Sequence, residues 1–279
     1  MNFMAVISVV IPALNDSAML TTCLQALQAQ TRLADEIIVV DNGSTDDTAA
    51  VARAAGARVV VEPRRGVPAA TSAGFDAARG SILGRLDADS LPDPGWVAEI
   101  EKRFHDVPDL AAITGPATFY GANRVVRRLG EALYLGGMHW SMDWLLGHPM
   151  IFGSNFAISA SAWARIRTTS HRDLPKVHDD LDLSLQVRPG MKVEYDPDLR
   201  VRISARPFDS FAGLARRVYW VQTTLSANSK EKSLLARRAE FKDWERSHLA
   251  TDPTFVGEEF GTSAEFGDTE FGGAELGAD

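Results

Sequence analysis

The stretch EIIVVDNGSTDDT, residues 36–48, places an apolar run directly before a polar turn. Residues 36–40 have the pattern of a strand that is buried on both faces, and Asp41 stands at its end. The turn leads into an Ala-rich segment, which predicts a helix from about Asp47. A buried strand, a turn and a helix in this order form the repeating unit of parallel α/β sheets.

The same unit recurs on both sides of this stretch. Residues 7–11 (ISVVI) predict a first strand that ends at Pro12, and Asp16 or Ser17 then caps a helix with apolar residues at helical spacing. Residues 58–61 predict a third strand. This alternation predicts a doubly wound, mostly parallel sheet flanked by helices, with its ligand crevice at the carboxyl ends of the strands.

Two carboxylates follow a further predicted strand at residues 81–83. Asp87 and Asp89 lie one residue apart in GRLDADS, residues 84–90. On a turn, two such carboxylates can converge on Mg²⁺ or Mn²⁺, which prefer oxygen ligands. The alternative is a solvated loop that caps the next helix. Asp41 has the same two interpretations, a base or ribose pocket or a helix-capping turn.

Composition sets the broad class of the protein. The 279 residues are 45% hydrophobic, enough for a substantial core, and the single cysteine, Cys23, excludes an internal disulfide and fits a reducing compartment. Of the 37 acidic residues, eight lie in 251–279, which leaves 29 acidic and 29 basic residues. The balanced remainder argues against nucleic-acid binding. Residues 1–11 lack the features of a signal peptide, so a cytoplasmic location is expected.

The second half of the sequence has a mixed pattern. We expect one domain over residues 1–250, with a nucleotide-binding half at 1–113, an acceptor and catalytic half at 114–207, and a basic helical region at 208–250, including one helix candidate at 208–247. Residues 251–279 carry a degenerate Glu-apolar-Gly repeat, and this acidic tail is predicted to be disordered.

Five blocks in order resemble the family 2 glycosyltransferases, which have the GT-A nucleotide-sugar-binding fold. They are VVIPALND (9–16), IIVVDNGSTDDT (37–48), GVPAATSAGFDAARGSILGRLDADS (66–90), GSNFAIS (153–159) and HDDLDLSLQV (178–187). Asp16 and Asp179 stand where the family usually has Glu. The resemblance covers about residues 7–187 and implies an α/β fold of the GT-A type.

The resemblance implies a role for each matching residue. The nucleotide and donor would contact Pro12, Ala13, Asn15, Asp41, Asn42, Gly43, Ser44, Asp87 and Ala88. Asp89, with Asp87, would hold a divalent cation, Mn²⁺ or Mg²⁺. Asp180 would be the catalytic base, and the sugar and acceptor would lie near Gly153, Asn155, His178 and Asp179.

The acidic cluster also has a purely structural interpretation. Asp179, Asp180 and Asp182 can simply form the first turn of a helix, favoured by the helix dipole. Because adjacent carboxylates disfavour joint ionisation, one of the pair Asp179 and Asp180 is expected to have a raised pKa. His178 either orients a diphosphate or packs locally, and His139 and His148 are expected to be structural.

The implied reaction is metal-dependent transfer of one sugar, with inversion, from a uridine or guanosine diphosphate sugar to a hydroxyl acceptor. A non-catalytic nucleotide-sugar-binding protein is the alternative from another class. A nucleotidyltransferase or a Rossmann dehydrogenase would need a glycine-rich loop after the first strand, which IPALNDS lacks. Processive synthesis is not expected, because RRVYW at 216–220 replaces the Gln-x-x-Arg-Trp block and no long apolar segment is present.

The acceptor class depends on a basic-then-apolar stretch. Arg124, Arg127 and Arg128 precede several apolar residues up to Leu145. This stretch either rests on an anionic membrane surface or packs as an ordinary helix. The first interpretation predicts peripheral membrane contact at the inner face and a lipid-linked or cell-envelope acceptor.

Overall fold

The computed structural model describes residues 5–121, 142, 144–206 and 211–249. Its centre is a seven-stranded sheet in the order β3-β2-β1-β4-β8-β6-β9. The strands are β1 (Ile7–Ala13), β2 (Glu36–Asp41), β3 (Arg58–Val61), β4 (Ile82–Arg85), β6 (Leu110–Thr114), β8 (Phe156–Ser159) and β9 (Lys192–Tyr195). Strands β3, β2, β1 and β4 run parallel, as do β6 and β9, whereas β8 is antiparallel to both its neighbours. The expected mostly parallel α/β sheet is confirmed.

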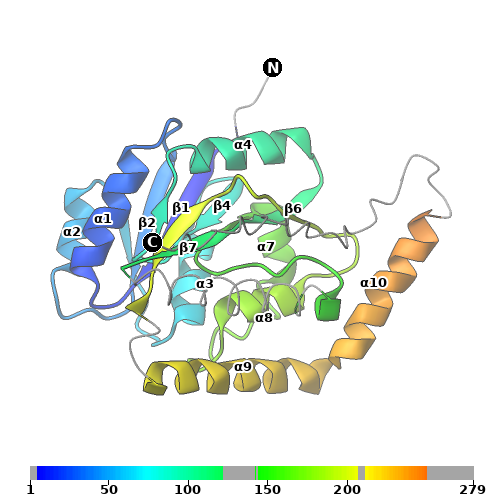
Figure 1. The fold of residues 1–279 in the computed structure, drawn as a ribbon. Helices are drawn as coiled ribbons and strands as arrows, with labels where there is room; N and C mark the ends of the chain where they lie inside the picture. The colour runs from blue at the N-terminus through cyan, green and yellow to red at the C-terminus, as the bar shows by residue number, and fades with distance from the viewer. Residues whose placement is uncertain (1–4, 122–141, 143, 207–210, 250–279) are drawn as a thin grey trace, which may run out of the picture.

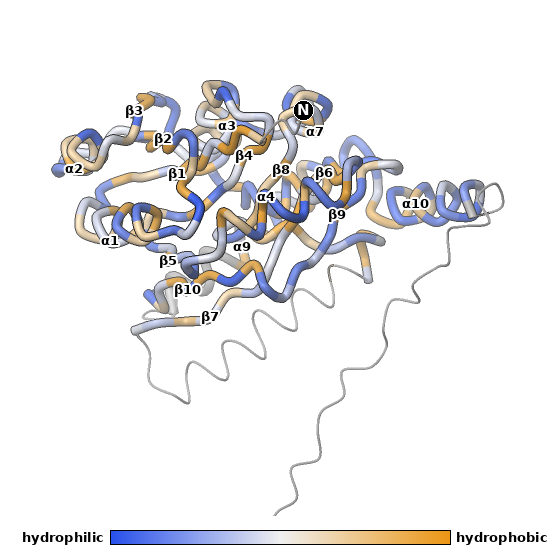
Figure 2. The backbone as a smooth tube through the Cα atoms, turned by 90° about the horizontal axis from the view of Figure 1, so that it is seen from above, coloured by the Kyte–Doolittle hydropathy of each residue, from blue (hydrophilic) through white to orange (hydrophobic). Residues whose placement is uncertain are grey.

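Helices cover both faces of this sheet (Figure 1). Helices α1 (Ser17–Gln28), α2 (Thr48–Ala54) and α4 (Trp96–Asp106) share one hydrophobic cluster, and α3 (Val67–Ala77), α7 (Ala160–Ile166) and α8 (Asp179–Gln186) share the other. Figure 2 shows α1 and α4 on one side of the strands and α3 and α7 on the opposite side. Side chains alternate along each strand, so Val9 belongs to the first cluster and Val10 to the second.

A second, three-stranded sheet lies against the α1 and α4 side. It has the order β5-β10-β7, formed by β5 (Leu91–Pro92), β10 (Val201–Ser204) and β7 (Ala117–Tyr120). Strand β5 directly follows the turn that carries Asp87 and Asp89. The phenol of Tyr120, at the end of β7, donates a hydrogen bond of 2.8 Å to the carbonyl oxygen of Asp89. This small sheet therefore fixes the acidic turn from outside the main sheet.

Two predicted strand boundaries differ from the structure. Strand β1 continues through Pro12 to Ala13, because β1 pairs with β4 only as far as Val10 and beyond that point has a neighbour on one side only. Strand β4 extends beyond residue 83 to include Arg85. The segments after residue 113 complete the same sheet, since β8 lies between β4 and β6.

The single basic helix expected at 208–247 is wrong. Two helices, α9 (Phe211–Glu231) and α10 (Leu234–Leu249), are separated at Lys232 and Ser233. The Ser233 hydroxyl accepts a hydrogen bond of 3.3 Å from the backbone N–H of Ala236 and so caps the new helix. The buried Arg237 donates to the carbonyl oxygen of Leu185, which ties α10 to the end of α8.

Several expectations concern residues outside the described ranges. These are the stretch with Arg124, Arg127 and Arg128, His139, residues 207–210 and the acidic tail at 251–279. The membrane-contact and tail predictions therefore stay predictions, as does the division of the domain. Within the described residues, every helix falls short of the length and apolarity that a membrane crossing requires.

Candidate active site

The carboxyl ends of β1 and β2 bring two predicted loops together. Ala13 and Asp41 are neighbours in the parallel register. The side-chain Oδ1 of Asn15 accepts a hydrogen bond of 2.7 Å from the N–H of Thr45, and the N–H of Asn15 donates to the Ser44 hydroxyl at 3.0 Å. Asn15 adopts a φ of 53°, and Asp41 accepts a 2.8 Å hydrogen bond from the N–H of Ser44. The loops after β1 and β2 thus form one rigid unit.

The side chain of Asn42, predicted to contact the donor, is bonded to the neighbouring loop. Its side chain is buried and donates hydrogen bonds to the carbonyl oxygens of Glu62 and Arg64, at 2.8 and 2.7 Å. Its Oδ1 accepts a third, of 2.8 Å, from the N–H of Gly66. All three hydrogen bonds hold the loop between β3 and α3, so the amide of Asn42 is committed to the protein itself.

The same loop places a cation beside the predicted nucleotide pocket. Gly43 has a φ of +88°, and a Cβ atom there would lie 3.3 Å from Cζ of Arg65. Glycine at this position permits both the left-handed backbone and the close guanidinium. Arg65 was not predicted as a site residue, because its approach to Gly43 depends on the fold of the loop.

The turn at residues 87–90 presents the two predicted cation ligands. Asp87 Oδ1 lies 2.7 Å from Arg85 Nη1, and Asp87 Oδ2 accepts a hydrogen bond from the Ser154 hydroxyl. Asp89 Oδ2 lies 3.1 Å from Arg206 Nη2. Burial and the negative charge of Asp87 raise the pKa of Asp89 to about 6, against the opposing effect of Arg206. Ala88 between them is buried in the core, so only its backbone can face a ligand.

Asp87 and Asp89 fit a divalent cation that is shared with a ligand. Burial first, and then the negative charge of Asp87, disfavour ionised Asp89, and Arg206 opposes them only in part. Among the residues that the structure describes, no group of three or more His, Cys, Asp or Glu side chains could hold a metal ion. Mg²⁺ commonly binds one or two carboxylates together with substrate phosphates, and this pair matches that donor set.

Arg85 is the central residue that sequence reasoning missed. It is 1% exposed, and its Nη2 lies 3.0 Å from Asp179 Oδ2, while Nη1 contacts Asp87 and donates to the carbonyl oxygen of Gly153. Its Nε has no hydrogen-bond partner among the described residues. A charged residue in a buried strand two positions before Asp87 was the available signal, but its other two partners, Gly153 and Asp179, lie 68 and 94 residues away.

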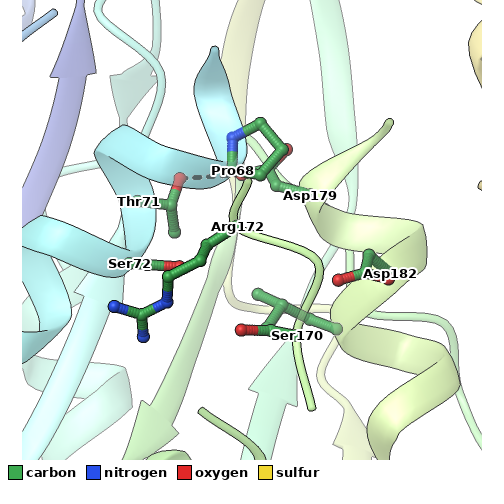
Figure 3. A pocket seen from close by; sticks show the side chains of 8 residues that line it. Pro68, Thr71, Ser72, Ser170, Arg172, Asp179 and Asp182 are labelled. Carbon is green, nitrogen blue, oxygen red and sulfur yellow. Dashed lines mark hydrogen bonds between the residues drawn. The ribbon is translucent and has the colours of Figure 1, made fainter. Parts of the chain in front are cut away.

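Asp179 faces the protein interior. Thr71 Oγ1 donates to Asp179 Oδ2 at 2.8 Å, the hydrogen bond dashed in Figure 3. Burial raises the pKa of Asp179, and the positive charge of Arg85 opposes that shift. The adjacent cavity has a volume of about 10 Å³, room for one water molecule and far too small for a sugar; it is lined by Pro68, Thr71, Ser72, Ser170, Arg172, Asp179, Asp182 and Leu183. The described contacts of Asp179 are thus to Arg85 and Thr71, and its acceptor role stays a prediction.

Asp180 lies in the first turn of α8 and points toward the turn at Gly153. Its Oδ2 accepts a hydrogen bond of 3.1 Å from the N–H of Gly153, and its Oδ1 accepts one of 2.7 Å from the N–H of Leu181. A Cβ atom at residue 153 would lie 3.0 Å from Oδ2, so any larger residue would require the Asp180 carboxylate to shift slightly. His178 Nδ1 lies 4.0 Å from Asp180 Oδ1, and its ring contacts Trp220 edge-on at 5.8 Å.

The three acidic residues do form a helix first turn, as the structural interpretation predicted. Their side chains nevertheless have different partners. Asp182 binds His171 and Asn228, with Oδ1 at 2.7 Å from His171 Nδ1 and 2.8 Å from Asn228 Nδ2. Of the three carboxylates, Asp180 is the one bonded to the Gly153 turn.

Asn155 and His148 have structural roles. Asn155 is fully buried; it accepts a hydrogen bond of 2.7 Å from the indole of Trp96 and donates to the carbonyl oxygens of Leu199 and Pro116, at 2.6 and 2.9 Å. The predicted sugar or acceptor contact at Asn155 is thus replaced by an anchor between the two sheets. Burial lowers the pKa of His148 to about 4, consistent with the expected structural role.

Curated relatives match part of the chain. An uncharacterized glycosyltransferase of Mycobacterium tuberculosis is 40% identical over 134 residues, which cover 48% of this chain and 52% of that protein. The glycosyltransferase AglE of Haloferax volcanii is 33% identical over 99 residues, 33% of each protein. The chain thus spans about half the length of the mycobacterial relatives that it matches.

Solved structures match over a larger share. Glucosyl-3-phosphoglycerate synthase from Mycobacterium tuberculosis with Mn²⁺, uridine diphosphate (UDP) and phosphoglyceric acid has a TM-score of 0.58 at 24% identity, covering 80% of this chain and 78% of that chain. The same enzyme with Mg²⁺ and UDP also has a TM-score of 0.58, at 23% identity, over 81% and 80% of the two chains. At this identity the likeness confirms the fold. The model of the family described as Glycosyl transferase family 2 matches residues 8–169, more than half of the sequence, and the chain therefore belongs to that family.

Proposed function

We propose that the chain transfers a single sugar from a nucleoside diphosphate sugar to a hydroxyl acceptor. The observation that carries the proposal is the bridge through Arg85. This one guanidinium contacts Asp87, on the proposed donor side, and donates to the carbonyl oxygen of Gly153. The N–H of Gly153 in turn donates to Asp180, on the proposed acceptor side. These contacts support the proposal because they join the proposed cation-binding turn and the candidate base in one bonded network.

The donor side would be built by the loops after β1 and β2. Asp41 would bind the base, and Pro12, Ala13, Asn15, Gly43 and Ser44 would shape its surroundings. A uridine nucleotide is the preferred donor, because the two structural neighbours described above contain UDP with Mn²⁺ or Mg²⁺. Arg65 is a candidate for a phosphate contact, since its guanidinium lies beside Gly43.

Asp89, with Asp87, would hold the divalent cation. When bound, the cation would offset the charge that develops on the departing nucleoside diphosphate. Arg85 and Ser154 orient Asp87, while the phenol of Tyr120 fixes the backbone at Asp89. These contacts preorganise the turn before a donor arrives.

Asp180 would act as the base on the acceptor side. A carboxylate that takes a proton from the acceptor hydroxyl contributes on the order of 10²–10⁴-fold to the rate. The N–H of Gly153 holds one oxygen of Asp180 in place. Because one base opposite the leaving group implies a single displacement, the proposed reaction inverts the anomeric carbon, which NMR of the product would test.

A lipid-linked or cell-envelope acceptor is the finer proposal, supported by the basic and apolar residues at 124–145. Peripheral contact at the inner membrane face would accompany it. The competing acceptor is a small phosphorylated hydroxy acid, because a structural neighbour contains phosphoglyceric acid. Co-sedimentation with anionic liposomes separates the two, since the second predicts that the protein stays in the supernatant.

A thermal-shift screen of nucleoside diphosphates with and without Mn²⁺ tests donor binding. UDP is expected to raise the melting temperature only when Mn²⁺ is present, and Asp89→Ala should abolish that rise while the variant stays folded. The matched control is Asp198→Ala, an exposed carboxylate that pairs with Arg200. An equal rise in the wild type and Asp89→Ala would contradict the cation role. Binding without any turnover would favour the non-catalytic alternative.

A further inference from the structure

Arg206 joins the proposed cation turn to the loop after β1. It follows β10, and its guanidinium lies between two carboxylates: Nη1 is 2.8 Å from Asp16 Oδ1 and Nη2 is 3.1 Å from Asp89 Oδ2. The backbone N–H of Arg206 donates to the Ser204 hydroxyl at 3.2 Å, which fixes the base of the side chain. The side chain itself is 44% exposed, so neighbouring atoms do not enclose it and it has room to change its conformation.

The charges around Arg206 favour its replacement by a stronger cation. One guanidinium serves two carboxylates, and Asp87 adds a third negative charge on the same turn. A divalent cation at Asp89 would compete with Arg206 for the same carboxylate oxygen and would repel the guanidinium by its own charge. The contact with Asp89 would then be lost, whereas the contact with Asp16 keeps Arg206 beside the proposed donor loops.

We propose that Arg206 is a diphosphate-binding residue that is held on Asp89 and Asp16 in the free protein. When a divalent cation occupies Asp89, the guanidinium turns to the phosphates of the donor. The planar fork of arginine suits phosphate oxygens, and its long side chain can move while its backbone stays fixed by β10. This inference rests on the proposed function, because it requires a nucleoside diphosphate at the turn.

A purely structural clamp is the competing explanation. In that case Arg206 would only join the small sheet to the loop after β1. Its removal would lower thermal stability and would free Asp89 for a cation, but it would leave the affinity for UDP at saturating Mn²⁺ unchanged. UDP binding at saturating Mn²⁺ therefore separates the two explanations.

The experiment compares the wild type with Arg206→Gln, and with Arg200→Gln as a matched control from the loop that precedes the same strand. Arg200 pairs with Asp198 and is exposed, so its loss should leave both affinities at wild-type values. Free Mn²⁺ is measured by electron paramagnetic resonance without nucleotide, and UDP is titrated calorimetrically at saturating Mn²⁺. Arg206→Gln is expected to bind Mn²⁺ several-fold more tightly and UDP about tenfold more weakly.

These opposite shifts are the signature of the proposal. Arg206→Lys keeps the positive charge but loses the planar guanidinium. It should bind Mn²⁺ with nearly wild-type affinity and still bind UDP more weakly than the wild type. Wild-type affinities for both ligands in a folded Arg206→Gln would overturn the inference alone. A wild type that binds neither Mn²⁺ nor UDP would instead overturn the proposed function, and the inference with it. Thermal unfolding of each variant shows that the comparison is made on folded protein.

Discussion

Arg85 is a buried cation between carboxylates, and its environment defines what its loss should do. A guanidinium that is 1% exposed must be paired, and both Asp87 and Asp179 provide negative charge within 3.0 Å. Among the described residues Nε of Arg85 has no hydrogen-bond partner, whereas both terminal nitrogens are bonded. We interpret Arg85 as a positioning residue that fixes the carboxylates on either side of it.

Replacing Arg85 by methionine should destabilise the protein strongly. The change leaves two carboxylates near each other without their cation, and breaking a buried ion pair typically costs about 3–5 kcal/mol. Urea denaturation measures the loss. The exposed pair of Arg200 and Asp198 provides the control, since Arg200→Met should cost less than about 1 kcal/mol. Equal free energies of unfolding for the two variants would show that the ion pairs of Arg85 do not stabilise the fold.

Asp89 should make the stability of the protein depend on pH. Its pKa is raised from 3.8 to about 6, so ionised Asp89 destabilises the fold above pH 6 and this penalty disappears as the pH falls toward 4. Asp89→Asn cannot ionise. The stability advantage of Asp89→Asn over the wild type should therefore shrink by up to ~3 kcal/mol between pH 7.5 and pH 4, without divalent cations. A difference that stays constant across this range contradicts the raised pKa.

Gly153 should control the placement of the candidate base. A methyl group at residue 153 would lie 3.0 Å from Oδ2 and 3.1 Å from Cβ of Asp180, so the carboxylate must shift. Gly153→Ala is expected to lower transfer by up to about tenfold, because even a small misplacement of a catalytic group is costly. UDP affinity should stay near the wild type. Gly95→Ala is the control, since a Cβ atom at residue 95 has no neighbour within 4 Å among the described residues.

At the level of secondary structure, the sequence predicts those elements whose signals are local. Continuous β-branched runs indicated β1, β2 and β3, and the acidic turn after β4 was evident from its spacing. Strand β8 could not be ordered from the sequence, because it enters between β4 and β6 from a distant segment. The three-stranded sheet was missed for the same reason, since its strands are short and come from three regions.

Site residues follow the same rule. Asp41, Asp89 and Asp180 carry local signals, because each follows a strand or begins a helix. Asn42 and Asn155 were expected at ligands, yet their amides bind backbone groups that only the folded chain brings near. Polar residues in a motif can thus stabilise its backbone conformation through hydrogen bonds. The sequence alone does not distinguish that role from ligand binding.

Phe241 should be a main anchor of helix α10, in addition to Arg237. Phe241 is 8% exposed, and its ring lies 5.1 Å from that of His148. Phe241→Ala is expected to cost about 3–5 kcal/mol of unfolding free energy. Leu235→Ala is the control on the same helix, because Leu235 is 71% exposed and its loss should be nearly neutral. Urea denaturation of both variants measures the difference, and a similar small loss in both would show that α10 is not docked through Phe241.

At the scale of the whole molecule, the two halves of the sheet bring the proposed donor and acceptor residues to one place. Strands β1, β2 and β4 deliver Asp41 and the acidic turn, while the segment before β8 delivers Gly153. Helix α8 adds Asp180 through its hydrogen bond to Gly153. The proposed reaction depends on this convergence, since transfer needs a bound donor and a base on opposite sides of one sugar.

The most direct measurement compares donor turnover by the wild type and Asp180→Asn at saturating Mn²⁺. The substitution removes the proton-accepting ability of the side chain with almost no change of shape. The rate of UDP release from UDP-sugars should fall at least about a hundredfold while UDP still binds with wild-type affinity. Asp198→Asn, at an exposed carboxylate, should release UDP at the wild-type rate. Turnover by Asp180→Asn at the wild-type rate would contradict the assignment of Asp180 as the base.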